Sequence, residues 1–345
     1  MKILWIGLSA LLVWIGTPAW AASLDCSKAV SVVEMMVCQD QTLSTLDETL
    51  SNLYQKGVKS GAAEVAESQE KWLQERNKCC DSKCVEIAYV HRLHALNSLL
   101  SATTRQGTAP GQEIFDPLTQ IAFVWVPGGE FQMGCGSWSS DCHADELPVH
   151  TAKVDGFWLG KYEVTQGQWL RLMGNNPSKF ALSENNPVDN ISWEDAQLFI
   201  RKNNASNPAQ YRLPTGAEWE FACRSGGKEE LYAGGNDPNQ VAWYNKNSQR
   251  KSHPVGQKTP NGLGLYDMSG NGWEWVEDWY DSTFYQSSAA SQPNPVNARA
   301  SSGLRAFRGG SWGSGTHELR CTARSGDWPN DRPYGNGGFR VVRIP

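Results

Sequence analysis

The sequence predicts two structured parts, a small all-α domain held together by disulfides and a larger α+β domain with much irregular backbone. Up to about residue 100, apolar residues recur at three- and four-residue spacing, which is typical of amphipathic helices. Beyond residue 120, short strand-like runs are separated by dense Gly, Pro, Asn and Asp. The composition changes in the same place, since 12 of the 16 tryptophans lie beyond residue 120.

The first residues have the pattern of a secretory signal peptide. Lys2 supplies a positive charge, residues 3–15 are almost wholly apolar, and residues 19–21 form the small-x-small sequence that precedes a cleavage site. A membrane anchor is the alternative, but the apolar run is shorter than the about 20 residues that a spanning helix needs. We therefore expect residues 1–21 to be removed after Ala21, which leaves no membrane span and makes the mature protein periplasmic or secreted.

Residues 22–100 are predicted to form the small helical domain. Leu43, Leu46 and Leu50 lie on one helical stripe, and Trp72 begins a second. Because so small a helical unit buries limited apolar surface, covalent links would stabilise it. Five cysteines are available for such links, and we expect two bridges and one free thiol. The residues assigned to bridges are Cys26, Cys38, Cys79 and Cys84, with the connectivity and the choice between Cys79 and Cys80 left open.

The order of motifs in this domain resembles the LprI-like (DUF1311) family of small exported helical domains. The matching features are the cysteines, a Leu/Asp/Tyr run at 43–54, Gln69-x-x-Trp72-Leu73-x-x-Arg76 and Tyr89-x-x-Arg92. Members of that family are linked to inhibition of lysozyme in the cell envelope. The resemblance therefore implies a protein-binding role for residues 22–100, and lysozyme inhibition is one alternative function for the chain.

Residues 101–118 are predicted to be a linker, because Gly and Pro interrupt any periodicity there. The second domain is expected to span residues 119–345, beginning with a buried strand at 121–126. Its helices are predicted from Ser or Thr residues suited to N-capping. They lie at 165–173, at 192–203 and in a shorter segment from Thr215.

Motifs along the second domain resemble those of the formylglycine-generating enzyme, or sulfatase-modifying factor, superfamily. They follow one another in complete order from residue 126 to residue 340, so chance agreement is negligible. The motifs are Val126-Pro-Gly-Gly-Glu-Phe-Gln-Met-Gly134, residues 157–165, 186–193, 211–220 and 264–275, Arg308-Gly-Gly-Ser-Trp312 and Gly338-Phe-Arg340. The resemblance implies the irregular α+β fold that is related to C-type lectins.

The chemistry of that superfamily is not expected here. Its active members are copper-dependent oxidases that use two cysteine thiolates, and thiolates are the ligands that Cu(I) prefers. Those cysteines follow the Gly-Gly-Ser-aromatic motif, in the interval that corresponds to residues 313–319. The interval contains no cysteine. We therefore expect neither copper binding nor the oxidase activity.

The four cysteines of the second domain are expected to be structural. The resemblance implies a bridge between Cys223 and Cys321. Cys135 and Cys142 flank a short loop, and a bridge that closes it would stabilise the fold by roughly 2–3 kcal/mol. Redox catalysis by Cys135 and Cys142 is the alternative, but nothing nearby in the sequence would activate a thiol.

Calcium is the cofactor that the resemblance implies. In the family, the segment that matches residues 267–274 wraps a Ca²⁺ ion, and hard oxygen ligands in a tight turn suit that ion. The ligands would be the side chains of Asp267 and Glu274 and the carbonyls of Gly270 and Gly272. The alternative is a hydrogen-bonded turn without a metal.

Histidine-based metal chemistry is not expected. A related branch, the ergothioneine-type sulfoxide synthases, binds iron through histidines of a larger N-terminal bundle, whose motif is missing here. His91 and His94 are interpreted as surface residues without a third ligand. The histidines of the second domain are scattered along the sequence: His143, His150, His253 and His317.

The surface that remains around the lost thiol pair is the predicted binding site. In catalytic members it is a groove that holds an extended peptide, and Trp and Arg are typical binding anchors. The residues expected to line it are Ser311, Trp312, His317, Arg320 and Arg324, although Trp312 and Arg324 would also suit core packing. A deep groove beside Ser311 would favour an enzyme, whereas a filled one would favour a scaffold.

These observations predict a non-catalytic, exported accessory or binding protein that recognises an envelope protein or peptide. The net charge of −5 gives no electrostatic reason to expect nucleic acid as a partner. Besides lysozyme inhibition, the alternative is a periplasmic enzyme of the same fold with non-thiol chemistry, of the siderophore-maturation type.

Overall fold

The computed structural model describes residues 24–59, 63–101, 107, 109–139, 141–207, 209–333 and 335–344. Contacts divide the chain into two compact units, Met1–Ala102 and Thr103–Pro345. Among the described residues, no helix combines the length and apolar character needed to cross a membrane. The predicted signal peptide, residues 1–21, lies outside the described residues.

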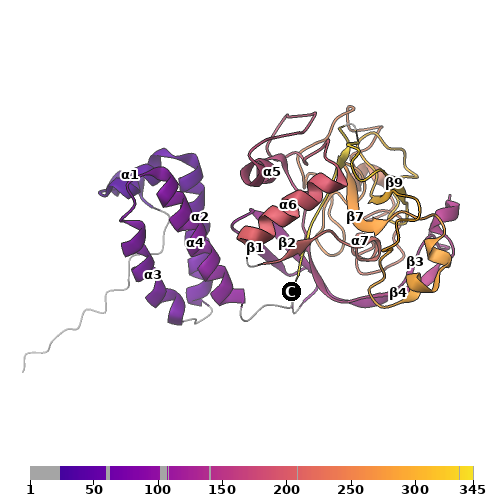
Figure 1. Cartoon of the computed structure of the whole chain (residues 1–345), viewed down its shortest axis with the longest axis horizontal. Helices are drawn as coiled ribbons and strands as arrows, with labels where there is room; N and C mark the ends of the chain where they lie inside the picture. Colours follow the sequence, from indigo (N-terminus) through magenta and orange to yellow (C-terminus); the bar gives the residue numbers. More distant parts are fainter. Residues whose placement is uncertain are drawn as a thin grey trace, which may run out of the picture. The chain divides into compact units, whose positions relative to one another are not determined.

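The described residues of the first unit form helices only (Figure 1). These helices bury their apolar side chains in one core. Its elements are η1 (Cys26–Lys28), α1 (Val32–Gln39), α2 (Gln41–Lys59), α3 (Ala63–Arg76) and α4 (Ser82–Ser101). Ser31 caps α1, because its side chain accepts from the N–H of Glu34 while the Glu34 carboxylate accepts from the N–H of Ser31. Leu43, Leu46 and Leu50 are buried where α2 packs against α4, as their spacing predicts.

Two disulfides close short loops in the helical unit. Cys26–Cys38 links η1 to α1, and Cys79–Cys84 links the turn after α3 to the first turn of α4. Cys80, the neighbour of Cys79, is exposed and free. Disulfides thus strengthen a unit whose core is small.

A buried polar network also joins these helices. The hydroxyl of Tyr89 donates to Oδ1 of Asp47 at 2.7 Å and accepts from Nη1 of Arg76 at 2.9 Å. Arg92, which is likewise buried, donates to Oε1 of Gln69 at 2.9 Å. The residues that carry the LprI-like resemblance therefore make internal contacts between helices.

Among the described residues, three β-sheets form the framework of the second unit, and Figure 1 labels several of their strands. Their orders are β1-β2-β5-β11-β6, β10-β7-β8-β9 and β3-β4, and all pairings are antiparallel except that of β10 with β7. The strands are β1 (Glu113–Asp116), β2 (Ile121–Val126), β3 (Gly129–Met133), β4 (His150–Val154), β5 (Phe157–Gly160), β6 (Tyr211–Arg212), β7 (Trp273–Trp279), β8 (Arg305–Arg308), β9 (Ser325–Asp327), β10 (Gly337–Gly338) and β11 (Val342–Arg343).

The three helices predicted from capping residues are confirmed. Thr165, Ser192 and Thr215 each accept a hydrogen bond from the third helical N–H, within a capping box. The helices that follow them are α5 (Gln166–Met173), α6 (Trp193–Ser206) and α7 (Gly216–Cys223). The remaining helical segments are α8 (Pro238–Val241), η2 (Ala144–Glu146), η3 (Phe284–Gln286) and η4 (Ser288–Ser291).

Part of the segment predicted to be a linker, residues 101–118, is instead a strand. β1 pairs antiparallel with β2, with Asp116 opposite Ile121. The buried Asp116 carboxylate accepts from the N–H of Leu118 and from Nδ2 of Asn207. The four residues of β1 show little apolar alternation, so the sequence pattern does not indicate a strand there. The strand is stabilised by its pairing with β2. The second domain therefore begins before residue 119.

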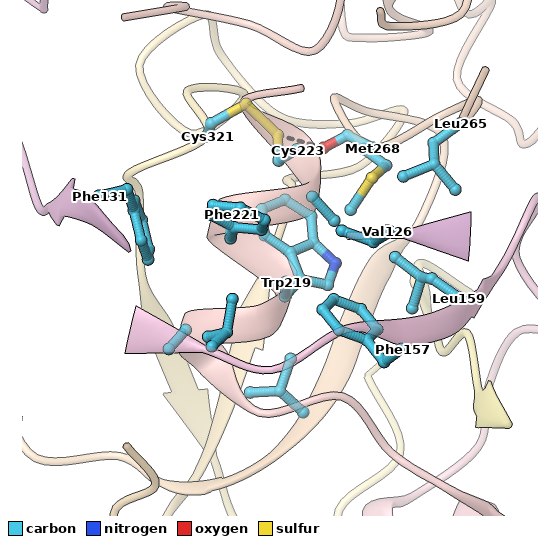
Figure 2. Packing of buried hydrophobic residues seen from close by; sticks show 14 of the residues in the cluster. Val126, Phe131, Phe157, Leu159, Trp219, Phe221, Cys223, Leu265, Met268 and Cys321 are labelled. Carbon is cyan, nitrogen blue, oxygen red and sulfur yellow. Dashed lines mark hydrogen bonds between the residues drawn. A yellow bond between two sulfur atoms is a disulfide. The ribbon is translucent and has the colours of Figure 1, made fainter. Parts of the chain in front are cut away.

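Aromatic side chains fill the interior of the second unit. Figure 2 shows Trp219 of α7 among Val126, Phe157 and Leu159, with none of the Trp219 surface exposed. The Cys223–Cys321 disulfide lies at the end of α7 in the same core. A second core contains further large rings, including Trp158, Trp275, Phe123, Phe199 and Phe339.

Candidate functional site

Two residues of the predicted groove, Ser311 and Arg320, are buried in the protein. Arg320 is 2% exposed and forms a two-pronged ion pair with Glu146, with both nitrogen–oxygen distances at 2.6 Å. Ser311 is 1% exposed, and its hydroxyl accepts from the N–H of Gly313. The groove prediction is therefore wrong for these residues. A carboxylate far away in the sequence neutralises the arginine and removes it from the surface.

Trp312 and Arg324 are half-buried and held by several contacts. Nε1 of Trp312 donates to the carbonyl of Gly335 at 2.8 Å, and the ring packs edge-on against Phe180. Arg324 donates to the carbonyl of Asp145 at 2.8 Å, and its guanidinium lies 4.2 Å from the centre of the Tyr285 ring. Both side chains thus contribute to packing, and only part of each reaches solvent.

A small pocket includes Arg324 but none of the other predicted groove residues. Its lining includes Met133, Ala217, Asp278, Tyr285, Arg308 and Arg324. Burial raises the pKa of Asp278, whose carboxylate accepts from the N–H groups of Gly216 and Asn297. The polar groups that line this pocket largely form hydrogen bonds within the protein.

The cysteines of the second unit form the bridges Cys135–Cys142 and Cys223–Cys321. All nine cysteines of the sequence lie within the described residues, and Cys80 of the helical unit is the free one. Residues 313–319 form a turn-rich segment without cysteine. The second unit therefore offers no reduced thiol for metal or redox chemistry.

Glu274, a predicted calcium ligand, is already paired with the guanidinium of Arg340. Its carboxylate accepts from Nε and Nη2 of Arg340 at 2.6 and 2.7 Å, and from Nε1 of Trp219 at 2.7 Å. Neither partner of this ion pair is exposed. With both oxygens engaged, Glu274 is a poor ligand for an additional ion unless Arg340 moves.

Two other carboxylates in this region have oxygens without a partner. Oδ1 of Asp267 and Oε1 of Glu163 are buried and accept no hydrogen bond from the described residues. Burial raises the pKa of Asp267 to about 6. Burial raises the pKa of Glu163 well above its ordinary range, and the charges of Asp267 and Glu274 raise it further. A buried anionic oxygen without a partner is costly, and a hard cation would satisfy it.

The backbone of the predicted calcium turn also approaches Glu163. A Cβ atom on Gly272 would lie 2.7 Å from Oε1 of Glu163, and Gly270 has φ +84°, a conformation that suits glycine. The oxygens of this turn that the fold leaves without a partner therefore belong to Asp267 and Glu163, whereas those of Glu274 are engaged. The sequence reasoning missed Glu163, although it stands as an acidic residue within the motif at 157–165.

The structure also brings together two histidines that seem scattered in the sequence. The rings of His143 and His317 face each other with their centres 5.9 Å apart, and both residues are exposed. His317 is the one predicted groove residue that is fully at the surface. Of the other histidines, His253 stacks on Trp243 at 3.8 Å and His150 packs against Tyr285.

Comparison with known proteins identifies the second unit. Residues 113–345 match the family described as the sulfatase-modifying factor enzyme 1-like domain. The chain belongs to this family. The family domain thus includes β1, and the helical unit precedes the matched residues.

Several curated proteins are similar to the chain. The chaperone protein LppX of Paenibacillus barcinonensis is 34% identical over 209 residues, which cover 46% of this chain and 71% of LppX. The formylglycine-generating enzyme of Streptomyces coelicolor is 29% identical over 287 residues, which cover 64% and 88%. The serine/threonine-protein kinase Pkn1 of Chlamydia trachomatis is 31% identical over 279 residues, which cover 74% of this chain and only 43% of the kinase.

Solved structures show the same fold. Treponema denticola variable protein 1 matches with a TM-score of 0.58 and 28% identity, covering 65% of this chain and 95% of that protein. PvdO from Pseudomonas aeruginosa matches with a TM-score of 0.61 and 24% identity, covering 69% and 99%. The sulfatase-modifying-factor fold is therefore retained here without the thiol pair.

Proposed function

We propose that this chain is a non-catalytic member of the family that acts in the cell envelope as an accessory or binding protein. The observation that carries the proposal is the state of its thiols. All four cysteines of the family domain are in disulfides, and the free Cys80 lies in the helical unit. Because copper chemistry of the family type needs two thiolates, these residues do not provide it.

An exported location is part of this proposal. The four disulfides support it, because such bonds form and persist in oxidising compartments such as the periplasm. The family resemblance to a chaperone, LppX, is consistent with an accessory role by analogy alone.

One exposed tryptophan, next to a half-buried cluster of two tryptophans and an arginine, supports recognition of a protein or peptide. Trp328 is 53% exposed. The residue that follows it in the chain, Pro329, accepts a hydrogen bond at its carbonyl from the N–H of Glu194. Beside Glu194, Trp193 is stacked on the guanidinium of Arg305, which lies 3.7 Å from the Trp193 ring and 3.6 Å from the Trp279 ring. Trp and Arg are the residues that most often anchor protein interfaces. We name these residues, Trp193, Trp279, Arg305 and Trp328, the Trp328 surface.

The test is affinity capture from envelope extract with the mature full chain and two variants. The Trp328→Ala variant should capture much less of the partner than the wild-type chain does. Leu182→Ala, which removes another exposed apolar side chain (59% exposed), should retain it. Capture of nothing by the wild-type chain would contradict a binding role. Capture of lysozyme that survives Trp328→Ala would favour the helical unit as the inhibitory part.

The chemistry is tested separately with copper. The Cys80→Ser variant lacks the free thiol of the helical unit. Titration of this variant with Cu(I) therefore reports binding that does not involve Cys80. We expect no stoichiometric binding. One tightly bound Cu(I) per chain in this variant would overturn the non-catalytic assignment.

Ca²⁺ is also proposed to bind the family domain, as a structural ion. Support comes from the unpartnered oxygens of Asp267 and Glu163, two neighbouring carboxylates that a bound cation would satisfy. The ion would hold residues 267–274 against the segment that precedes α5. Its expected effect is on stability.

A further inference from the structure

The turn at η2 gathers side chains that can bind a metal ion. His143, Asp145 and Glu146 each offer a ligand atom, and these atoms all lie within 4.8 Å of one another. His143 is exposed, whereas Asp145 and Glu146 are buried. The cluster therefore lies at the protein surface with its carboxylates fixed beneath it.

A second histidine, from residues 313–319, lies next to His143. The His317 ring is centred 5.9 Å from that of His143, with 31° between the ring planes. An imidazole nitrogen binds Zn²⁺ at about 2.0–2.1 Å, which places the centres of two rings that share one ion about 5–6 Å apart. The separation of the two rings is compatible with a shared ion, although His317 is not among the residues whose ligand atoms lie within 4.8 Å of one another, so its exposed side chain has to rotate toward them.

The turn that carries these ligands is held rigidly. Glu146 is occupied by Arg320 and by the hydroxyl of Thr322, at 2.6 Å each. The hydroxyl of Tyr280 donates to Oδ2 of Asp145 at 2.9 Å, and Arg324 binds the Asp145 carbonyl. Glu146 is thus an anchor for the turn, while Asp145 keeps a second carboxylate oxygen for a ligand.

The disulfide Cys135–Cys142 adds to this rigidity, because Cys142 immediately precedes His143. Ligands that are already immobilised lose little conformational entropy when a metal binds. Sulfur is not available at this site, since both nearby cysteines are in the disulfide.

We propose that His143 and Asp145, joined by His317 once its exposed side chain rotates toward them, form a binding site for a divalent transition-metal ion of the Zn²⁺ class. Two imidazoles and a carboxylate are ligands that suit Zn²⁺, whereas Ca²⁺ and Mg²⁺ prefer all-oxygen sites and Cu(I) prefers sulfur. Three protein ligands leave a coordination position for water. The site is distinct from the calcium turn and does not depend on the proposed binding function.

The experiment is a Zn²⁺ titration by calorimetry on the mature full chain with Cys80→Ser, so that no free thiol contributes. We expect one equivalent of Zn²⁺ to bind. His143→Ala and His317→Ala should each weaken that binding at least ~10-fold, by loss of a direct ligand. His91→Ala, another exposed histidine, is the matched control and should bind as the parent does. Melting temperatures verify that the variants are folded.

Asp145 is tested with its hydrogen-bond partner as the control. Asp145→Asn removes the carboxylate charge and should also weaken Zn²⁺ binding at least ~10-fold. Tyr280→Phe removes only the hydrogen bond that Tyr280 donates to Asp145, so Zn²⁺ binding should stay close to that of the parent. Replacement of Zn²⁺ by Co²⁺ should give visible absorption bands that are absent from the double variant His143→Ala/His317→Ala. Unchanged Zn²⁺ affinity in that double variant, or loss in only one single variant, would overturn the shared site.

Discussion

Arg340 and Glu274 form an ion pair with no exposure of either side chain, with Nε 2.6 Å from Oε2 and Nη2 2.7 Å from Oε1. Arg340 also donates to the carbonyls of Gly160 and Tyr266. The Gly338-Phe-Arg340 motif thereby connects the motif around Glu274 with strand β5. Two of the sequence motifs that resemble the family meet in this one contact.

Removal of one member of this pair should destabilise the second unit strongly. Arg340→Met leaves the Glu274 carboxylate buried without its cation, a change that typically costs 3–5 kcal/mol in the free energy of unfolding. Urea unfolding measures it. Arg332→Met is the control, because the Arg332–Asp195 pair has side chains 54% and 22% exposed and should contribute at most about 1 kcal/mol. Similar losses in both variants would contradict the importance of burial.

The two disulfides of the second unit should differ in their effect on stability. Cys223 and Cys321 are 98 residues apart, whereas Cys135 and Cys142 are 7 apart. The chain-entropy estimate gives about 4.7 kcal/mol for a loop of roughly 100 residues and about 2–3 kcal/mol for a loop of under ten. Unfolding of the two double Cys→Ala variants in denaturant should show the larger loss for Cys223/Cys321. The reverse order would rule out loop length as the main factor.

Ca²⁺ should stabilise the protein through Asp267. Added Ca²⁺ should raise the melting temperature of chelator-treated protein, because it satisfies the unpartnered carboxylate oxygens. Asp267→Asn should remove most of that increase, while the exposed Asp331→Asn should preserve it. A melting temperature that does not respond to Ca²⁺ in the wild-type chain would favour a turn without a metal.

His253 should make stability depend on pH. Burial lowers the pKa of this imidazole, which stacks on Trp243, and the nearby Lys251 and Lys258 lower it further. Between the folded pKa and the ordinary value of about 6.5, the unfolded chain binds more protons than the native one, so stability rises with pH there. The contribution is complete above about pH 6.5 and is lost as the pH falls through the folded pKa.

The measurement is the free energy of unfolding of wild-type protein and His253→Gln from pH 8 to pH 5. The difference between them should change below about pH 6.5, with the wild type losing stability relative to the variant. His91→Gln, at an exposed position of α4, serves as the control. Parallel curves for wild type and His253→Gln would contradict the assigned role.

Local signals in the sequence predict local structure well in this chain. Thr165, Ser192 and Thr215 identify helix starts because a capping hydrogen bond involves only the next three residues. The strand β1 lacks such a signal, since its pairing partner β2 defines it. A motif order that extends along the whole domain was sufficient to predict the fold.

The site is harder to predict because its residues meet across long stretches of sequence. The burial of Arg320 depends on Glu146, which is 174 residues earlier. The contact between His317 and His143 likewise requires η2 to pack against the segment that follows β8. Likewise, Glu163 acquires its significance only from the charges of Asp267 and Glu274 around it. Such contacts have no periodicity that a sequence pattern could indicate.

The polar network of the helical unit has a consequence for how its relatives are recognised. Asp47, Arg76, Tyr89 and Arg92 are largely engaged with one another and with neighbouring helices. A motif built from such residues is a folding signature, so two chains that share it can present unrelated outer surfaces. Specificity for a partner would then reside in solvent-facing positions such as Val30 and Val32, which are 87% and 60% exposed. Homologues with the same motif could therefore diverge freely in the proteins they contact.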